Sequence, residues 1–145
     1  MKFRSLAVVA VISLAAVLFT GCLGGGAALT SEQAVHKVLD DFERAISKKD
    51  AHKLASLLVY PLEMDGEYFE SFEEAAAAYE LGLAFFTEIH EFRLIDREIT
   101  INGDEAVAEV TAKSKMTILG ETLEDAIPGT LTFRRVGSTW KITGQ

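Results

Sequence analysis

The spacing of apolar residues changes once along this chain of 145 residues, and the change divides the expected fold. Between Val35 and Phe86, apolar residues recur every three or four positions, which is typical of amphipathic helices that bury one side. From Phe92 onward they alternate with polar residues, as in strands with one buried face. Helices followed by strands predict an α+β fold. We expect a curved antiparallel sheet of about four strands, wrapped over three N-terminal helices.

Local signals place the ends of these elements. N-cap signals predict helix starts at Thr30 (with Gln33), Asp50 and Ser71 (with Glu74). Turn pairs occur at Asp65-Gly66, Asn102-Gly103, Gly120-Glu121 and Gly137-Ser138, and Pro128-Gly129 is expected to open the third long strand. In the first long strand, Phe92 and Leu94 alternate in one phase and Ile99 and Ile101 in the other. This conflict predicts a bulge or a strong twist.

The first residues have the pattern of an export signal. Lys2 and Arg4 precede an apolar run from Leu6 to Leu18, broken only by a serine. The run ends in Leu-Phe-Thr-Gly-Cys22, which resembles the lipobox of prokaryotic lipoproteins, although Phe19 stands where leucine is usual. The resemblance implies cleavage before Cys22 and a diacylglyceryl group on its sulfur. We therefore expect a signal peptide (1–21), a lipidated cysteine with a Gly-rich tether (22–29) and one domain (30–145).

Two other interpretations of this segment stay open. Leu6 to Leu23 is just long enough to cross a bilayer as an uncleaved helical anchor, and the protein could also be secreted without an anchor. The lipoprotein hypothesis accounts best for the lone cysteine, because a free thiol is otherwise unusual in an exported chain. It places the domain in the cell envelope, on the extracytoplasmic face of the membrane. The net charge of −8 argues against a nucleic-acid binder, which needs a basic footprint.

Three stretches of the mature chain resemble nuclear transport factor 2-like domains, which include ketosteroid isomerases, SnoaL-like cyclases and many small lipoprotein domains. They are the helix pattern Val38–Asp50, the pattern Leu-Ala-Ser-Leu-Leu at 54–58, and the closing segment Gly137–Ile142. The resemblance covers about residues 31–143. It implies a cone-shaped, cystatin-like fold in which a curved sheet surrounds a pocket lined by helices.

The resemblance also directs attention to catalytic positions. In ketosteroid isomerases a tyrosine on the first helix stabilises an oxyanion and an aspartate moves the proton. The tyrosine position falls on Phe42, which has no hydroxyl, and the proton-shuttling position falls near Asp65. Asp65 is a weak candidate for a general base, because Asp-Gly is equally a turn pair. The histidines show no metal-ligand spacing, so we expect no metal and no cofactor.

Polar groups for a pocket can only be guessed from the strand pattern. The candidates for ligand binding are amphipathic or charged residues near the expected sheet faces: Tyr60, Tyr68, His90, Arg93 and Arg135. We expect the domain to bind either a small apolar molecule or an envelope protein.

Three functions remain open on the sequence alone. The first is a lipid-anchored envelope protein whose domain binds a small ligand or a protein without catalysis. The second is an enzyme of the SnoaL or ketosteroid isomerase type that uses Asp65 as general base. The third is a structural domain or homodimer, which the charged strand face of Glu109, Lys113 and Lys115 mildly disfavours.

Overall fold

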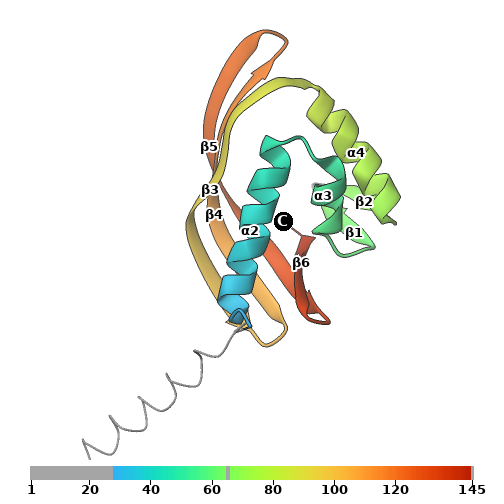
Figure 1. Cartoon of the computed structure of the whole chain (residues 1–145), viewed down its shortest axis with the longest axis vertical. Coiled ribbons are helices and arrows are strands. Elements are labelled where there is room, and N and C mark those ends of the chain that lie inside the picture. Colours follow the sequence, from blue (N-terminus) through green and yellow to red (C-terminus); the bar gives the residue numbers. More distant parts are fainter. Residues whose placement is uncertain (1–27, 65, 145) are drawn as a thin grey trace, which may run out of the picture.

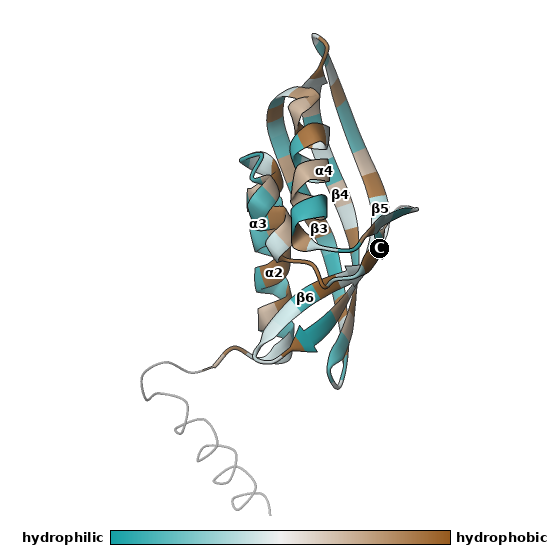
Figure 2. Ribbon diagram, turned by 90° about the vertical axis from the view of Figure 1, so that its right-hand side faces the viewer, coloured by the Kyte–Doolittle hydropathy of each residue, from teal (hydrophilic) through white to brown (hydrophobic). Residues whose placement is uncertain are grey.

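Three helices lie on one face of a curved antiparallel sheet in the computed structural model, which describes residues 28–64 and 66–144 (Figures 1 and 2). The sheet order is β3-β4-β5-β6, and a separate hairpin pairs β1 with β2. The expected α+β architecture with a four-stranded antiparallel sheet is therefore confirmed. The elements are α2 (Ser31–Ser47), α3 (Ala51–Ser56), β1 (Leu62–Met64), β2 (Glu67–Phe69), α4 (Phe72–Ala84), β3 (Phe86–Asn102), β4 (Glu105–Ile118), β5 (Glu121–Val136) and β6 (Thr139–Gly144).

The helices begin where the capping signals predict. The Thr30 side chain accepts a hydrogen bond from the backbone N–H of Gln33, whose side chain accepts in return from the Thr30 N–H. Asp50 and Ser71 cap α3 and α4 in the same way, each through a side-chain oxygen. These bonds satisfy donors that the first turn of a helix leaves unpaired.

The expected bulge is present in β3. Pairing with β4 shifts between Ile95 and Glu98, and Asp96 between them has a φ of 53°. The shift lets Leu94 and Ile99 lie on the same face of the sheet, opposite Ala112 and Ala108 of β4. An extra residue in one strand reconciles the two phases, as the sequence pattern requires.

Two strands begin earlier than expected. β3 starts at Phe86, a residue that the helical spacing had assigned to the preceding helix, because α4 ends at Ala84. β5 starts at Glu121 and runs through Pro128, which was expected to open the strand. β6 pairs with β5 only from Thr132 onward, so the outer half of β5 has a free edge, where a proline is tolerated.

The core lies between α2 and the concave face of the sheet. Val35 and Leu39 of α2 are fully buried in one cluster with Ala108, Phe133 and Ile142. The chain after α3 closes this side, because the N–H of Val59 donates to the carbonyl of Ile142 and the N–H of Ile142 donates to that of Leu57.

Several sequence-based expectations fall on residues outside the described part of the chain. These are the signal peptide, Cys22 and most of the tether, and also Asp65. None of the described helices is long and apolar enough to span a membrane.

Candidate functional site

The long helix α2 borders a hollow between its C-terminal half and the concave sheet, which we call the apolar groove. Its volume is about 320 Å³, at the lower end of the range for small-molecule sites. The strand positions that face α2 supply one wall, and Ala112 and Gly129 leave room because they are small. The lining residues are Phe42, Ile46, Phe92, Leu94, Val110, Ala112, Ile127, Pro128, Gly129, Thr130 and Leu131.

No titratable side chain belongs to this lining. Thr130 is the only lining residue that carries a hydroxyl, and Phe42 contributes a plain phenyl ring from α2. The groove is open at the end near the outer part of β5, where the sheet extends beyond the helices. Ile127 there is 57% exposed, which is unusual for a large apolar side chain on a concave face. The groove can therefore hold apolar surface but offers no acid or base among the described residues.

A buried ionic network holds β3 against α2 beside this groove. The Glu43 carboxylate accepts the backbone N–H of Leu94 at 2.5 Å and the Arg97 guanidinium at 2.8 Å. Arg97 also pairs with Asp40 at 2.7 Å, and the Arg97 side chain is only 16% exposed. Burial alone would lower the pKa of Arg97, but the bonds to Asp40 and Glu43 outweigh it and raise the pKa. The network fixes the bulge of β3, and with it the position of Leu94 in the groove wall.

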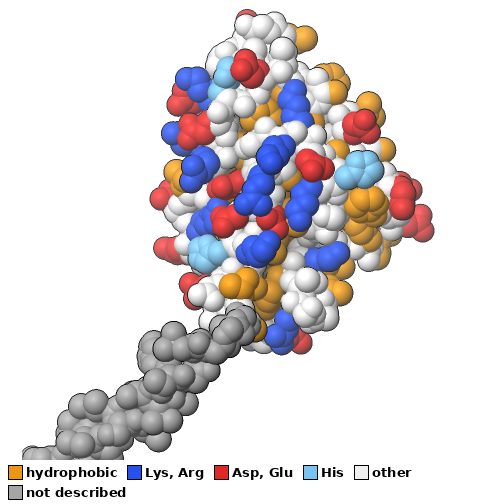
Figure 3. Space-filling model, in the orientation of Figure 1, with side chains coloured by type: hydrophobic (Ala, Val, Ile, Leu, Met, Phe, Trp, Pro, Cys, Tyr) orange, Lys and Arg blue, Asp and Glu red, His pale blue; other side chains and the backbone are white. Residues whose placement is uncertain are grey.

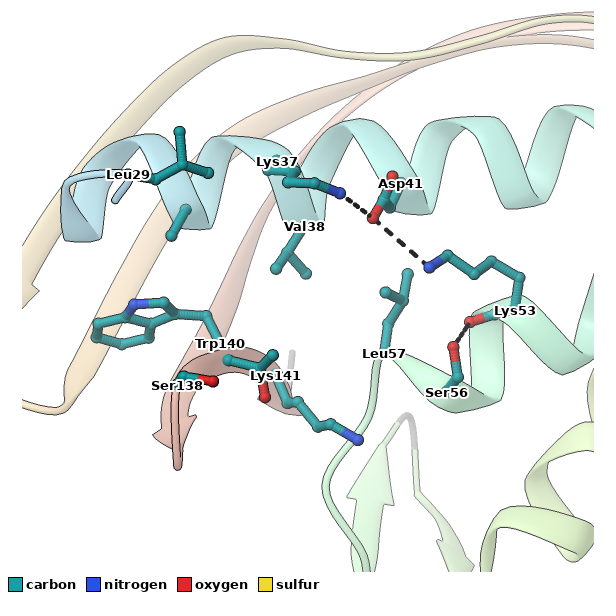
Figure 4. A pocket seen from close by; sticks show the side chains of 12 residues that line it. Leu29, Lys37, Val38, Asp41, Lys53, Ser56, Leu57, Ser138, Trp140 and Lys141 are labelled. Carbon is teal, nitrogen blue, oxygen red and sulfur yellow. Dashed lines mark hydrogen bonds and ion pairs between the residues drawn. The ribbon is translucent and has the colours of Figure 1, made fainter. Parts of the chain in front are cut away.

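A second hollow, which we call the basic groove, lies on the other side of α2, between α2, α3 and β6 (Figure 4). Its volume is about 340 Å³. Apolar side chains line it together with three lysines and one aspartate. The lining residues are Leu29, Ala34, Lys37, Val38, Asp41, Lys53, Ser56, Leu57, Ser138, Thr139, Trp140 and Lys141.

Asp41 lies in this groove under several positive charges. Its side chain is only 11% exposed, and it pairs with Lys37 at 2.9 Å, Arg44 at 3.0 Å and Lys53 at 3.6 Å. Burial alone would raise the pKa of Asp41, but the Lys37 hydrogen bond and the charges of Lys53, Lys37 and Arg44 together lower it. Asp41 is therefore a carboxylate, and its charge balances only part of the positive charge around it.

The two tyrosines singled out from the sequence lie outside both grooves. The Tyr60 hydroxyl donates to the carbonyl of Ala55 at 2.7 Å. Burial, with smaller effects of Tyr79 and Glu73, raises the pKa of Tyr60 to about 12. Tyr68 is on β2 and is largely exposed. The structure therefore does not bring these two side chains to a common cavity.

The three basic candidates are also dispersed. His90 lies on β3 and its Nε2 is 2.8 Å from the Thr117 hydroxyl. Arg93 approaches the Glu43 carboxylate at 3.6 Å. Arg135 pairs with Asp104, and its guanidinium lies 5.9 Å from the centre of the Trp140 ring, in the lining of another hollow next to the basic groove. Their proposed role in ligand binding stays a prediction, as does that of Asp65, which the structure does not describe.

Sequence patterns had no means of finding the basic groove. Lys37 and Asp41 are a turn apart on α2, but Lys53 comes from α3 and Lys141 from β6. Each of these lysines taken alone has the pattern of a solvated surface residue. The described residues contain no group of three His, Cys, Asp or Glu side chains suited to hold a metal ion.

Solved structures with this fold are numerous. A nuclear transport factor 2-like (NTF2-like) protein from Cytophaga hutchinsonii superposes with a TM-score of 0.65 and 21% identity over 80% of this chain and 95% of that one. An NTF2-like protein with a cystatin-like fold from Novosphingobium aromaticivorans gives a TM-score of 0.62, at 17% identity over 78% and 77% of the two chains. These similarities establish the fold.

Other structural neighbours are named after enzymes. A candidate dehydratase of the NTF2-like family from Streptomyces avermitilis has a TM-score of 0.63, at 22% identity over 77% of this chain and 89% of that one. No curated protein sequence matches the chain. The family profile described as SnoaL-like domain matches residues 35–145, which is most of the chain. This protein therefore belongs to the SnoaL-like domain family, within the nuclear transport factor 2-like fold.

Proposed function

We propose that this protein is a lipid-anchored envelope protein whose SnoaL-like domain binds a small apolar ligand in the apolar groove without transforming it. The observation that carries the proposal is the chemistry of the groove lining, which is apolar except for Thr130 and has no titratable side chain. Burial of apolar surface in such a cavity favours binding by roughly 25 cal/mol per Å² before the costs of association are subtracted.

The position of Phe42 argues against ketosteroid isomerase chemistry. The resemblance in sequence puts the oxyanion-stabilising tyrosine at this position, and Phe42 indeed lines the groove. A phenyl ring donates no hydrogen bond to a developing negative charge, and such a donor commonly accounts for a large share of catalysis. The name of the Streptomyces avermitilis neighbour favours the enzyme alternative. Without a tyrosine at position 42, that alternative depends on Asp65 alone.

Binding in the apolar groove can be tested by methyl NMR on the full chain in phosphatidylcholine nanodiscs. A neutral aromatic probe, 3-phenylpropan-1-ol, should shift the methyl signals of Ile46, Leu94 and Ile127 in a saturable way. Ala112→Phe fills the groove and should weaken this binding at least about tenfold. Ala126→Phe is the matched control, because Ala126 is exposed on the same strand pair but does not line the groove.

Two results would contradict the binding proposal. One is a probe that shifts these methyl signals equally in both variants. The other is turnover of an added enone or hydroxy-ketone that is lost in Asp65→Asn, since this would establish the enzyme alternative.

The proposed anchor is supported by the sequence around Cys22 and by the Gly-rich tether that follows. Two acyl chains on one residue hold a protein stably at a membrane, whereas one chain holds it only marginally. Mass spectrometry of the protein purified from membranes should show an N-terminus at Cys22 that carries a diacylglyceryl group. A chain that retains Met1, or that has an unmodified Cys22, would refute the anchor.

A further inference from the structure

The basic groove is rich in lysine although the chain as a whole is acidic. The whole chain is acidic, with 14 basic and 22 acidic residues. Yet Lys37, Lys53 and Lys141 line this one hollow with Asp41 as their only acidic companion in the lining. Figure 3 shows basic side chains gathered over the face where α2 lies, with acidic and apolar side chains between them.

The positive charge in the groove is only partly neutralised. Lys37 and Lys53 converge on Asp41 from opposite sides (Figure 4), and Arg44 binds the other oxygen of the same carboxylate. One carboxylate cannot balance three cations. Lys141 approaches from β6, and its ammonium makes no ion pair or side-chain hydrogen bond within residues 28–64 and 66–144.

The rest of the groove is apolar. Val38 and Leu57 line it from α2 and from the end of α3, and Leu29 and Trp140 line it on the side of the tether and of β6. A cation beside such low-dielectric walls attracts an anion more strongly than it would in open water. A ligand that fits must therefore combine one acidic group with an apolar body, because either part alone leaves half of the lining unmatched.

We infer that the basic groove is a second binding site, which takes a small soluble amphiphilic anion such as an aryl or alkyl carboxylate. The acidic group lies between Lys141 and Lys53, and the apolar body lies against Leu57 and Trp140. The volume of about 340 Å³ suits a molecule of this size. This site is on the opposite side of α2 from the apolar groove, so either site can be present without the other.

Trp140 provides a direct measurement, because it is the only tryptophan in the chain. The full chain in phosphatidylcholine nanodiscs is titrated with 4-phenylbutyrate and, separately, with the neutral 4-phenylbutanamide, with fluorescence excited at 295 nm. We expect a saturable change in Trp140 emission with the carboxylate, and at least about tenfold weaker binding of the amide.

Three variants test the role of the charges. Lys141→Met removes the ammonium that has no partner among the described residues and should weaken carboxylate binding about tenfold, with no change in thermal unfolding. Lys115→Met is the matched control, because Lys115 is a partly exposed strand lysine paired with Glu124 outside the groove, and it should bind as the parent does. Asp41→Asn removes the competing carboxylate and should strengthen binding about threefold.

The titrations distinguish a site for a soluble anion from a surface that binds lipid. Equal affinity for carboxylate and amide, or equal weakening by Lys141→Met and Lys115→Met, would overturn the inference. A Trp140 response to phosphatidylglycerol in the nanodisc, with none to 4-phenylbutyrate, would assign the groove to lipid headgroups and refute a soluble ligand. The methyl signals of Ile46 and Ile127 should not change with 4-phenylbutyrate. A failure of the basic-groove proposal can therefore be told apart from a failure of the apolar-groove proposal.

Discussion

The two grooves that flank α2 have similar volumes, about 320 and 340 Å³, but opposite chemistry. On the side of the concave sheet, Phe42 and Ile46 of α2 face a lining that is almost entirely apolar. On the side of α3 and β6, Lys37 and Asp41 of the same helix sit at the margin of an apolar hollow. One amphipathic helix thus lines both grooves, because its apolar stripe faces the sheet and the flank beside it borders α3 and β6.

The difference shows how neighbouring elements change the role of a surface charge. A lysine at the edge of a helical stripe is ordinarily solvated and contributes little to stability. Where α3 and β6 pack beside this edge, Lys37 borders a cavity although its side chain stays 62% exposed, and it is available for binding. Substitutions on the two sides of α2 test this contrast.

The network around Glu43 should carry the largest contribution to stability. Glu43→Leu leaves the Leu94 N–H without its acceptor and Arg97 without one of its two carboxylates, at a cost of about 3 kcal/mol in the free energy of unfolding. Urea denaturation measures this loss, and the methyl signal of Leu94 should move because the groove wall loosens. Trp140 emission should stay unchanged in the folded variant.

Asp40→Asn is the control for this network. Asp40 binds the same Arg97, but its side chain is 54% exposed, so its loss should cost at most about 1 kcal/mol. Equal costs for Glu43→Leu and Asp40→Asn would show that burial does not distinguish the two carboxylates.

Asp41→Asn tests the basic groove through the pH dependence of stability. Because the pKa of Asp41 is lower in the folded state than its ordinary value of 3.8, its ionisation stabilises the fold above that pH. This contribution is lost as the pH falls through the lowered pKa. The difference in unfolding free energy between parent and variant should be about 1 kcal/mol at pH 7. It should disappear in strong acid, and a difference that does not depend on pH would contradict the ionic role.

Tyr60 should stabilise the protein without serving either groove. Tyr60→Phe removes the hydrogen bond to the Ala55 carbonyl and should cost about 1 kcal/mol near pH 7. Because the pKa of Tyr60 is raised from 10 to about 12, the unfolded chain loses this proton first, and the parent loses stability between pH 10 and 12. Denaturation curves of parent and variant should converge in that range. A weakened binding of either probe would instead restore Tyr60 as a ligand-binding residue.

Ile127→Lys should have the smallest effect on folding. The side chain is 57% exposed, so the free energy of unfolding should change by less than about 0.5 kcal/mol. The charge nevertheless enters the apolar groove and should weaken binding of 3-phenylpropan-1-ol severalfold in the methyl NMR titration. If binding is unaffected, the open end of the groove near β5 plays no part in it.

Much of the fold could be predicted from spacing and turn chemistry. The caps at Thr30, Asp50 and Ser71 and the bulge near Asp96 depend on neighbours within a few residues, so the local pattern contains them. The starts of β3 and β5 were misjudged. Phe86 continues the helical spacing, and Pro128 breaks strands in general but is accepted at the free edge of β5.

The candidate site was predictable only in part. Phe42 was identified from the sequence as the residue in place of a catalytic tyrosine, and it does line the apolar groove. The fold does not bring together the five polar candidates, because they lie on different elements: Tyr60 precedes the small hairpin, Tyr68 lies on it, His90 and Arg93 lie on β3, and Arg135 lies on β5.

The order of helices and strands and the lipobox-like pattern before Cys22 follow from residues close together in the chain, and the acidic character follows from composition. The meeting of Lys37, Lys53 and Lys141 beside Trp140 was decided by tertiary structure alone. These residues lie on three elements separated by up to about a hundred positions. Only the packing of α3 and β6 against α2 turns them into one groove, because attraction and burial depend on distance in space.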